Sequence, residues 1–528
     1  MTTDLLAFPS SLVGIELDRR KGLSRQLYEA LRQRILDGQL GSGTRLPASR
    51  DLAKSLSISR NTAMRAYDQL YAEGFIEGRV GDGTYVAQLQ SAQKHAKSKA
   101  PKILSTKRST GLSTSLPTAL STKDIESNLL SASKVIHSTG LAILEKHHLN
   151  VPPAGAPRAF RVGVPAFDLF PFAVWGRLHA AFWRNASADQ LGYGEPAGDW
   201  HLRELIAAYL RSSRSLQCTA EQIVITSGAQ QAISLCAQLL LNAGDTVAVE
   251  NPGYRAAGHA FAITGARLQG MAVDAEGMRC DTLEAAGCNL AYVTPSHQYP
   301  TGVVMSLARR LQLLTWAEKT GGWVIEDDYD GEYRYSGAPL APLAALDRAE
   351  RVLYVGTFGK IAFPALRLGY LVLPPGLAKA FGQRKALDMR HSEVGTQAVM
   401  AQFIASGHFL RHIRRIRRAA LSRRDALLAG WPAQLPGCLT MPTAVAGLHV
   451  TVRVASLARE RELIEQAASV GVEINALSDY WLPDSQEPMD SRAGLVLGFA
   501  AVPEQAIAGA LSSLRSVWSP PAKGSAKP

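Results

Sequence analysis

A lysine, an aspartate and an arginine stand after short apolar runs in the second half of the chain. Lys360 closes the segment VLYVGTFGK, Asp327 closes WVIED, and Arg367 follows the lysine by seven residues. A partly desolvated lysine has a lowered pKa and can form a Schiff base. A carboxylate at the end of an apolar strand is costly unless it pairs with a cation, and a pyridinium nitrogen would supply one. Lys360 alone would more often be a surface lysine.

A second feature is a turn suited to anions. The residues Ser227-Gly228-Ala229-Gln230-Gln231 follow the apolar run IVIT and open a helical pattern. Backbone amides at the start of a helix can hold a phosphate group, and Arg367 with Thr357 could complete its site. The turn, the strand-end Asp327-Asp328-Tyr329 and the spacing from Lys360 to Arg367 together outweigh the surface-lysine interpretation.

These residues require an α/β scaffold. Short Val- and Ile-rich runs alternate with helical patterns, which predicts a mostly parallel sheet. Ligands of such sheets bind at the carboxyl ends of the strands, where the residues above stand. We therefore predict a large α/β domain over 156–520 with a small C-terminal α+β subdomain, and a disordered tail over 521–528. No apolar run approaches the ~20 residues that span a bilayer.

The first 87 residues follow another pattern. Apolar residues at helical spacing predict a helix in LSRQLYEALRQRIL, followed by two more helices and a hairpin around FIE and TYV. Ser49 and Ser59 are predicted to cap the second and third helices. Three helices and a hairpin of this size predict a winged helix-turn-helix domain over 1–87.

The third helix of this domain carries side chains suited to DNA. Arg60 and Asn61 have the donor geometry for guanine and adenine edges in the major groove, and the hydroxyl groups of Ser59 and Thr62 can bind phosphates. Each residue alone would more often be a solvated polar residue. The predicted group also contains Arg45, Arg50 and Arg65, and as a group these residues favour DNA binding.

Between the two domains we predict a flexible basic linker over 88–155. Residues 91–150 carry nine basic and three acidic side chains, which is half of the net charge of +12, and they are rich in Ser, Thr and Lys. A stretch with few aromatic residues and little periodicity cannot bury enough apolar surface to offset its ordering entropy. The linker could stay close to DNA or serve only as a soluble tether.

The segment from GTRLPASRDLA to GDGTYV resembles the DNA-binding domain of the GntR family of bacterial repressors. The resemblance implies that Gly81 of the wing lies at the minor groove. Met64 occupies a position that is basic in some relatives, and Arg65 stands beside it. The positions that the resemblance implies in DNA contact are Arg50, Ser59, Arg60, Asn61 and Thr62.

The segments LGYGEPAGDW, ITSGAQQAI, VENPGY, PSHQYPTG, IEDDYDGEYRY, GTFGK and RLGY resemble the fold type I aminotransferases, which use pyridoxal 5'-phosphate. The resemblance implies that Lys360 carries the internal aldimine, that Asp327 neutralises the pyridine nitrogen and that Tyr329 hydrogen-bonds the phenolic oxygen. It also implies ring stacking by Tyr254 and a contact from Tyr193 to the phosphate of a partner subunit. The implied phosphate ligands are Gly228, Ala229, Gln230, Thr357 and Arg367.

The whole chain resembles the MocR/GabR family of bacterial transcriptional regulators. This resemblance implies a homodimer, often head-to-tail, that binds operator DNA. It implies that the cofactor itself, or an amine or amino-acid effector, is sensed at Lys360. From the composition, the scattered cysteines and the lack of a signal-like start we expect a cytoplasmic protein that is nucleoid-associated when bound to DNA. Two other hypotheses stay open: a working aminotransferase with a DNA-binding appendage, and a regulator whose cavity is only structural.

Three positions depart from the aminotransferase pattern. Val496 stands where an arginine usually binds the α-carboxylate, with Arg492 as a candidate substitute. Tyr299 replaces the asparagine of NPTG, which usually hydrogen-bonds the phenolic oxygen, and Ala229 replaces a common hydroxyl residue. We therefore expect a site that keeps the cofactor but binds substrate loosely, with at most partial aminotransferase chemistry.

Two other features receive plainer interpretations. The run RHIRRIRRAALSRR holds seven arginines between Arg411 and Arg424; it could touch DNA, but a long helix bridging two subdomains is favoured. The histidines His297, His391 and His449 lie near motifs without metal-ligand spacing. The five cysteines form no CxxC pair, so no metal site is predicted.

Overall fold

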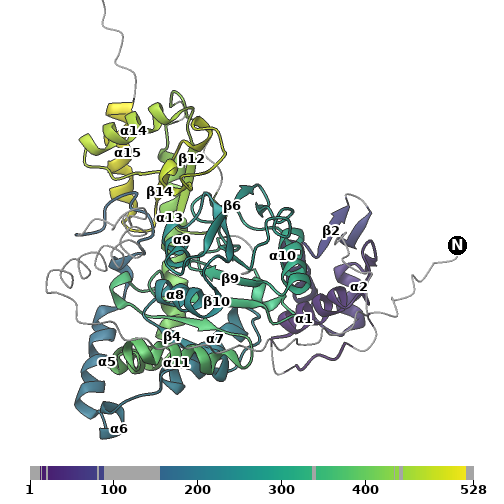
Figure 1. Cartoon of the computed structure of the whole chain (residues 1–528). Coiled ribbons are helices and arrows are strands. Elements are labelled where there is room, and N and C mark those ends of the chain that lie inside the picture. Colours follow the sequence, from purple (N-terminus) through teal and green to yellow (C-terminus); the bar gives the residue numbers. More distant parts are fainter. Residues whose placement is uncertain are drawn as a thin grey trace, which may run out of the picture. The chain divides into compact units, whose positions relative to one another are not determined.

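The computed structural model describes residues 12, 15–19, 22–79, 82–87, 155–335, 340–432, 435–438 and 444–518 (Figure 1). The predicted linker, apart from residue 155, and the predicted tail lie outside these described residues. None of the described helices is both long and apolar enough to cross a membrane.

The N-terminal domain is a winged helix-turn-helix, as predicted. Its sheet is antiparallel with strand order β1-β3-β2, and Leu27, Leu31, Leu70 and Phe75 are buried between its helices and strands. The short strand β1 was not predicted. The elements are α1 (Leu23–Leu36), β1 (Arg45–Leu46), α2 (Ser49–Ser55), α3 (Arg60–Ala72), β2 (Ile76–Arg79) and β3 (Gly83–Val86).

The two cap predictions in this domain have different outcomes. Ser59 caps α3, because its Oγ accepts a hydrogen bond of 3.1 Å from the Thr62 amide. The prediction for Ser49 is wrong, since Ser49 is already the first residue of α2. Ala48 is the N-cap, because its backbone lies outside the helical region and its carbonyl accepts a hydrogen bond from the Leu52 amide. The helix therefore begins one residue earlier than a Ser49 cap would allow.

The large domain contains an eight-stranded sheet with the order β4-β11-β10-β9-β8-β5-β6-β7. The strands from β10 to β6 in this order are parallel, whereas β11 and β7 are antiparallel to their neighbours. The predicted mostly parallel sheet is therefore confirmed. The strands are β4 (Ile223–Thr226), β5 (Thr246–Asn251), β6 (Arg267–Asp274), β7 (Gly277–Met278), β8 (Leu290–Val293), β9 (Trp323–Asp328), β10 (Val352–Thr357) and β11 (Gly369–Val372).

Helices cover both faces of this sheet. In β10, Leu353 and Val355 face the core formed with α8, α9 and α11, while Tyr354 between them faces the core formed with α7, α12 and α13. A strand buried on both faces is apolar throughout, which explains the continuous run VLYV. The helices are α5 (Phe172–Asn185), α6 (Ala188–Leu191), α7 (Trp200–Ser213), α8 (Ala229–Leu240), α9 (Arg255–Ala262), α10 (Leu307–Thr320), α11 (Leu377–Met389), α12 (Val394–Ala405) and α13 (His408–Gly430).

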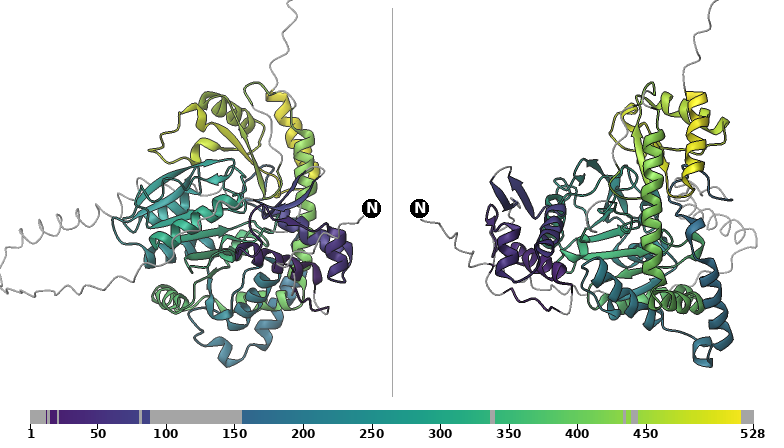
Figure 2. Two further views of the ribbon diagram at one scale, coloured as in Figure 1. Left: turned by 90° about the vertical axis from the view of Figure 1, so that its right-hand side faces the viewer. Right: turned by 180° about the vertical axis from the view of Figure 1, so that it is seen from behind.

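A small C-terminal α+β subdomain follows. Its antiparallel sheet has the order β12-β14-β13, and its elements are β12 (His449–Arg453), α14 (Leu457–Ser469), β13 (Asn475–Ala476), β14 (Gly494–Gly498) and α15 (Glu504–Trp518). The long helix α13 extends to this subdomain and packs on α15 (Figure 2). The Arg417 side chain donates to the Glu332 carbonyl and Arg423 to the Ala500 carbonyl, which agrees with the bridging-helix interpretation of the arginine run.

Candidate functional sites: a cofactor cavity and a DNA-binding surface

A cavity of about 280 Å³ lies at the carboxyl ends of the central strands. Of the predicted cofactor residues, only Tyr193 does not line it, and Tyr193 is 90% exposed. The structure thus brings together residues that span 140 positions of the chain. Those that line the cavity are Gly228, Ala229, Gln230, Tyr254, Asp327, Tyr329, Thr357, Lys360 and Arg367.

One end of the cavity is suited to an anion. Helix α8 begins at Ala229 without a side-chain cap, and Gly228 before it has a φ of +89° that favours glycine. The Arg367 guanidinium donates to the Ser227 carbonyl at 2.8 Å, and a Cβ at Gly228 would lie 3.6 Å from that guanidinium. The helix amides and the arginine therefore face the same space, as a phosphate site requires.

Lys360 follows β10 and reaches across the cavity. Its Nζ donates to the Gly163 carbonyl at 2.7 Å. Burial lowers the pKa of Lys360, while the charges of Asp330 and Asp327 oppose this effect. A lowered pKa increases the fraction of neutral amine, which is the form that attacks an aldehyde.

Asp327 has one satisfied and one open oxygen. The Tyr292 hydroxyl donates to its Oδ2 at 2.6 Å, whereas its buried Oδ1 has no hydrogen-bond partner among the described residues. Burial raises the pKa of Asp327 to about 7, and this is the larger effect, because the Tyr292 hydrogen bond acts in the opposite direction. A protonated pyridine nitrogen would satisfy Oδ1 and compensate the buried charge, so these residues fit pyridoxal phosphate.

The predicted DNA-binding side chains are gathered at the start of α3 and close to it. Arg60, Asn61 and Arg65 on α3 and Arg50 on α2 are exposed. The hydroxyl groups of Ser59 and Thr62 lie 2.8 Å apart at the N-terminus of α3. The first turn of a helix can bind phosphate and enter the major groove, so this surface is suited to DNA.

The wing side of this surface is described only in part. Arg45 donates to the Asp82 carbonyl at 2.6 Å, which places its guanidinium against the hairpin. Met64 is 40% exposed and Arg65 is exposed beside it. Gly81 lies outside the described residues.

Comparisons with known families match both parts of the chain. The family of aminotransferases class I and II matches residues 159–470, and the gntR family of bacterial regulatory proteins matches residues 23–86. Among solved structures, the Pyrococcus horikoshii kynurenine aminotransferase, solved in complex with PMP, has a TM-score of 0.61 at 27% identity. This similarity covers 75% of this chain and 96% of that one.

Similar proteins share the whole arrangement. The probable rhizopine catabolism regulatory protein MocR of Rhizobium meliloti is 33% identical over 504 residues, which are 96% of this chain and 95% of the relative. The chain belongs to the MocR family of transcriptional regulators. The pyridoxine biosynthesis transcriptional regulator PdxR of Corynebacterium glutamicum is 30% identical over 490 residues, or 93% of this chain and 94% of that relative. As a MocR-type regulator, the protein binds DNA through its GntR domain and pyridoxal phosphate through its aminotransferase domain.

The position that was predicted to correspond to the carboxylate-binding arginine of aminotransferases holds a buried apolar residue. Val496 is fully buried in the middle of β14, opposite Thr451 and Asn475. Arg492 does not replace it, because its guanidinium donates to the carbonyl groups of Ser485 and Glu487. Among the described lining residues, the lysine or arginine side chains are Lys360 and Arg367 alone.

Several residues in the MocR-type cavity and beside it could not be placed from the sequence. Tyr292 contacts Asp327 because β8 and β9 are adjacent, and this adjacency is not visible in the sequence. His449 reaches the cavity from β12 of the small subdomain. His297, Asp330 and His449 bring their ligand atoms within 4.8 Å of one another, although their spacing in the sequence gave no reason to group them.

Proposed function

We propose that this regulator senses pyridoxal phosphate itself, or an amine that reacts with the bound cofactor, at Lys360. The observation that carries the proposal is the joint placement of Lys360, the open carboxylate oxygen of Asp327 and the Arg367 phosphate site in one cavity. These groups match the aldehyde, the ring nitrogen and the phosphate of one molecule. A ligand changes DNA binding only through its different affinity for two arrangements of the dimer.

When bound, the cofactor supplies an aldehyde that condenses with a primary amine and a ring that withdraws electrons. Lys360 provides this amine, and its lowered pKa keeps more of it neutral. Asp327 holds a proton on the ring nitrogen, and the amides of α8 with Arg367 bind the phosphate. An effector amine would compete with Lys360 for the same aldehyde carbon.

A regulatory role is favoured over turnover. Val496 and the engaged guanidinium of Arg492 leave the described part of the cavity without a second guanidinium for a carboxylate. We expect a half-reaction at most when an amino donor and a keto acid are supplied. Multiple turnover under these conditions would instead support an aminotransferase with a DNA-binding appendage.

We further propose a homodimer, with the head-to-tail arrangement as our working geometry. Tyr193 is 90% exposed and lies outside the cavity of its own chain, so it is available to reach the phosphate of a partner subunit. Tyr193→Phe should weaken cofactor binding while its own cavity stays intact. Sedimentation of a monomer with full cofactor affinity would contradict this proposal.

The test of sensing is an operator-binding titration of the full chain. Binding to DNA should change at least severalfold when pyridoxal phosphate is added to the wild-type protein, and primary amines should then shift it further. Lys360→Ala should bind DNA but lose both responses. If Lys360→Ala responds like the wild type, Lys360 is not the sensing residue.

A further inference from the structure

Two groups of one residue, His297, contact the hydroxyl group of Tyr329. That hydroxyl donates to the His297 carbonyl at 2.9 Å, and Nδ1 of His297 lies 3.1 Å from the same hydroxyl oxygen. Tyr329 directly follows β9, whereas His297 lies in the turn after β8. The carbonyl group and the imidazole ring of His297 therefore both contact the Tyr329 hydroxyl group.

Asp330 determines which atom of His297 carries a proton. Oδ2 of Asp330 lies 2.9 Å from Nδ1 of His297, and an ionised carboxylate only accepts, so Nδ1 is the donor. The same N–H group also faces the hydroxyl oxygen of Tyr329, and this contact is the longer of its two hydrogen bonds. Asp330 and His297 are 1% and 3% exposed, and a charge-assisted bond is stronger in such a buried position than in water.

The imidazole ring has little room to move. At Gly447, where φ is +81°, a Cβ would lie 1.9 Å from Cε1 of His297, and at Gly302 it would lie 3.2 Å from Nε2. The His449 ring packs against the His297 ring with 4.7 Å between centroids, and its Nε2 donates to the Pro300 carbonyl at 2.9 Å. His297 is thus held in one orientation by backbone on two sides.

Tyr299, at the usual asparagine position, does not take this role. Its hydroxyl lies 3.0 Å from the Tyr480 hydroxyl. The geometry points to His297 as a positioning residue that Asp330 orients and that presents the Tyr329 hydroxyl to the phenolic oxygen of pyridoxal phosphate. This inference rests on the proposed function. With the cofactor present, the Tyr329 proton turns from the His297 carbonyl to the phenolic oxygen, and the imidazole N–H strengthens this donor.

The groups that surround His297 come from several elements. Asp330 and Tyr329 follow β9, His449 lies on β12, and Arg214 follows α7. Arg214, His297 and Asp330 together line a cavity of about 10 Å³. Because the charge of Asp330 also acts on Lys360, replacing Asp330 would change the protonation of Lys360 directly. His297 and Tyr329 are therefore the residues to change.

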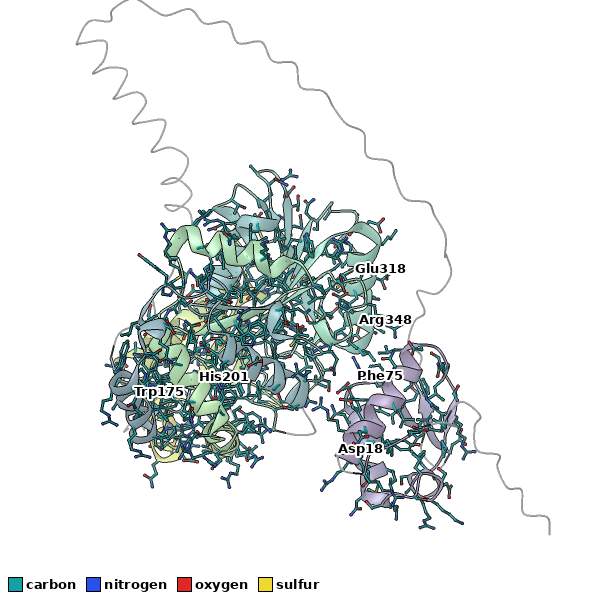
Figure 3. The ribbon with its side chains drawn as sticks, turned by 90° about the horizontal axis from the view of Figure 1, so that it is seen from below. Asp18, Phe75, Trp175, His201, Glu318 and Arg348 are labelled. Atoms are coloured by element: carbon teal, nitrogen blue, oxygen red, sulfur yellow. The ribbon has the colours of Figure 1, made fainter. Side chains whose placement is uncertain are left out.

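The experiment is a pH titration of the visible absorption band of the full chain loaded with pyridoxal phosphate. When the hydrogen bond that Tyr329 donates to the phenolic oxygen is weaker, that oxygen holds the proton near it more tightly. The pH midpoint of the absorption change should therefore rise. We expect a rise of about 1 pH unit in Tyr329→Phe and about 0.5 pH unit in His297→Asn. His201→Asn, a control at an exposed histidine of α7 (Figure 3), should leave the midpoint unchanged.

A double variant separates positioning from general damage. His297→Asn combined with Tyr329→Phe should shift the midpoint no further than Tyr329→Phe alone, because His297 acts through that hydroxyl. Additive shifts, or an unchanged midpoint in His297→Asn, overturn the inference. If His297→Asn does not fold, His297→Gln, alone and combined with Tyr329→Phe, gives the same comparison. A wild-type protein without any band overturns the proposed cofactor site and this inference with it.

Discussion

Nζ of Lys360 donates a hydrogen bond of 2.7 Å to the carbonyl of Gly163, 197 residues earlier in the chain. Gly163 belongs to a segment that is fastened to the small subdomain. Phe160 forms a bridge with Gly498 of β14, and Arg161 forms an ion pair of 2.7 Å with Glu473. Lys360 therefore connects the cavity to the first described segment of the large domain.

This connection predicts a local change in hydrogen exchange. In cofactor-free protein, Lys360→Ala should increase amide exchange in residues 160–163 by about 2- to 10-fold, because one hydrogen bond to the segment is lost. Lys379→Ala, at an exposed lysine of α11, is the control and should change nothing there. Equal exchange in wild type and Lys360→Ala would show that the bond does not hold the segment.

The DNA surface predicts a loss of affinity at Arg60. Arg60→Ala should weaken binding to a duplex selected by the wild-type protein by about 5- to 150-fold, since a bidentate base contact contributes about 1–3 kcal/mol. Arg461→Ala, at an exposed arginine of α14, should bind like the wild type. Fluorescence anisotropy at fixed salt measures both, and equal affinities for all three proteins would exclude Arg60 from the interface.

The two serines at the starts of α2 and α3 form a matched pair. Ser59→Ala should lower the free energy of unfolding by about 1 kcal/mol, because the Thr62 amide loses its side-chain acceptor. Ser49→Ala removes no cap and should change it by less than about 0.5 kcal/mol. Denaturant unfolding of the variants decides the point, and equal losses would contradict the cap assignment.

The buried carboxyl group of Asp327 predicts a pH-dependent stability in cofactor-free protein. Burial raises its pKa from 3.8 to about 7. The neutral carboxyl group therefore makes its full contribution to the free energy of unfolding below pH 3.8, and this contribution is lost as the pH rises to about 7. Asp327→Asn stays neutral. The melting temperature of Asp327→Asn minus that of the wild type should therefore increase by about 2–4 °C between pH 5 and pH 8.

Asp388→Asn is the control for this titration, since Asp388 is an exposed carboxylate of α11. Its melting temperature should follow that of the wild type across the same pH range. An Asp327→Asn difference that is flat or that shrinks with rising pH would mean that Asp327 is already charged and stabilised without the cofactor.

Much of the cavity could be predicted because its residues directly follow strands in the sequence. Lys360, Asp327 and the turn at Gly228 each stand after an apolar run, and parallel strands bring such positions to one edge of the sheet. Tyr292 and His449 could not be placed, because their roles depend on which strands are neighbours and on where the small subdomain packs.

Local signals had similar limits. Ser59 and Ser49 both precede helical patterns, but only the backbone shows that Ala48 is already the cap of α2. The role inferred for His297 depends on Gly447, which is 150 residues away in the chain and leaves space for the ring. No spacing rule connects these two residues.

The central claim is that this regulator holds pyridoxal phosphate through Lys360. Its most direct test is the visible absorption spectrum of the purified protein, alone and with added pyridoxal phosphate, beside Lys360→Ala. We expect a visible band in the wild type that Lys360→Ala lacks. A wild-type protein without this band even after the cofactor is added, or a Lys360→Ala variant that keeps it, would contradict the claim.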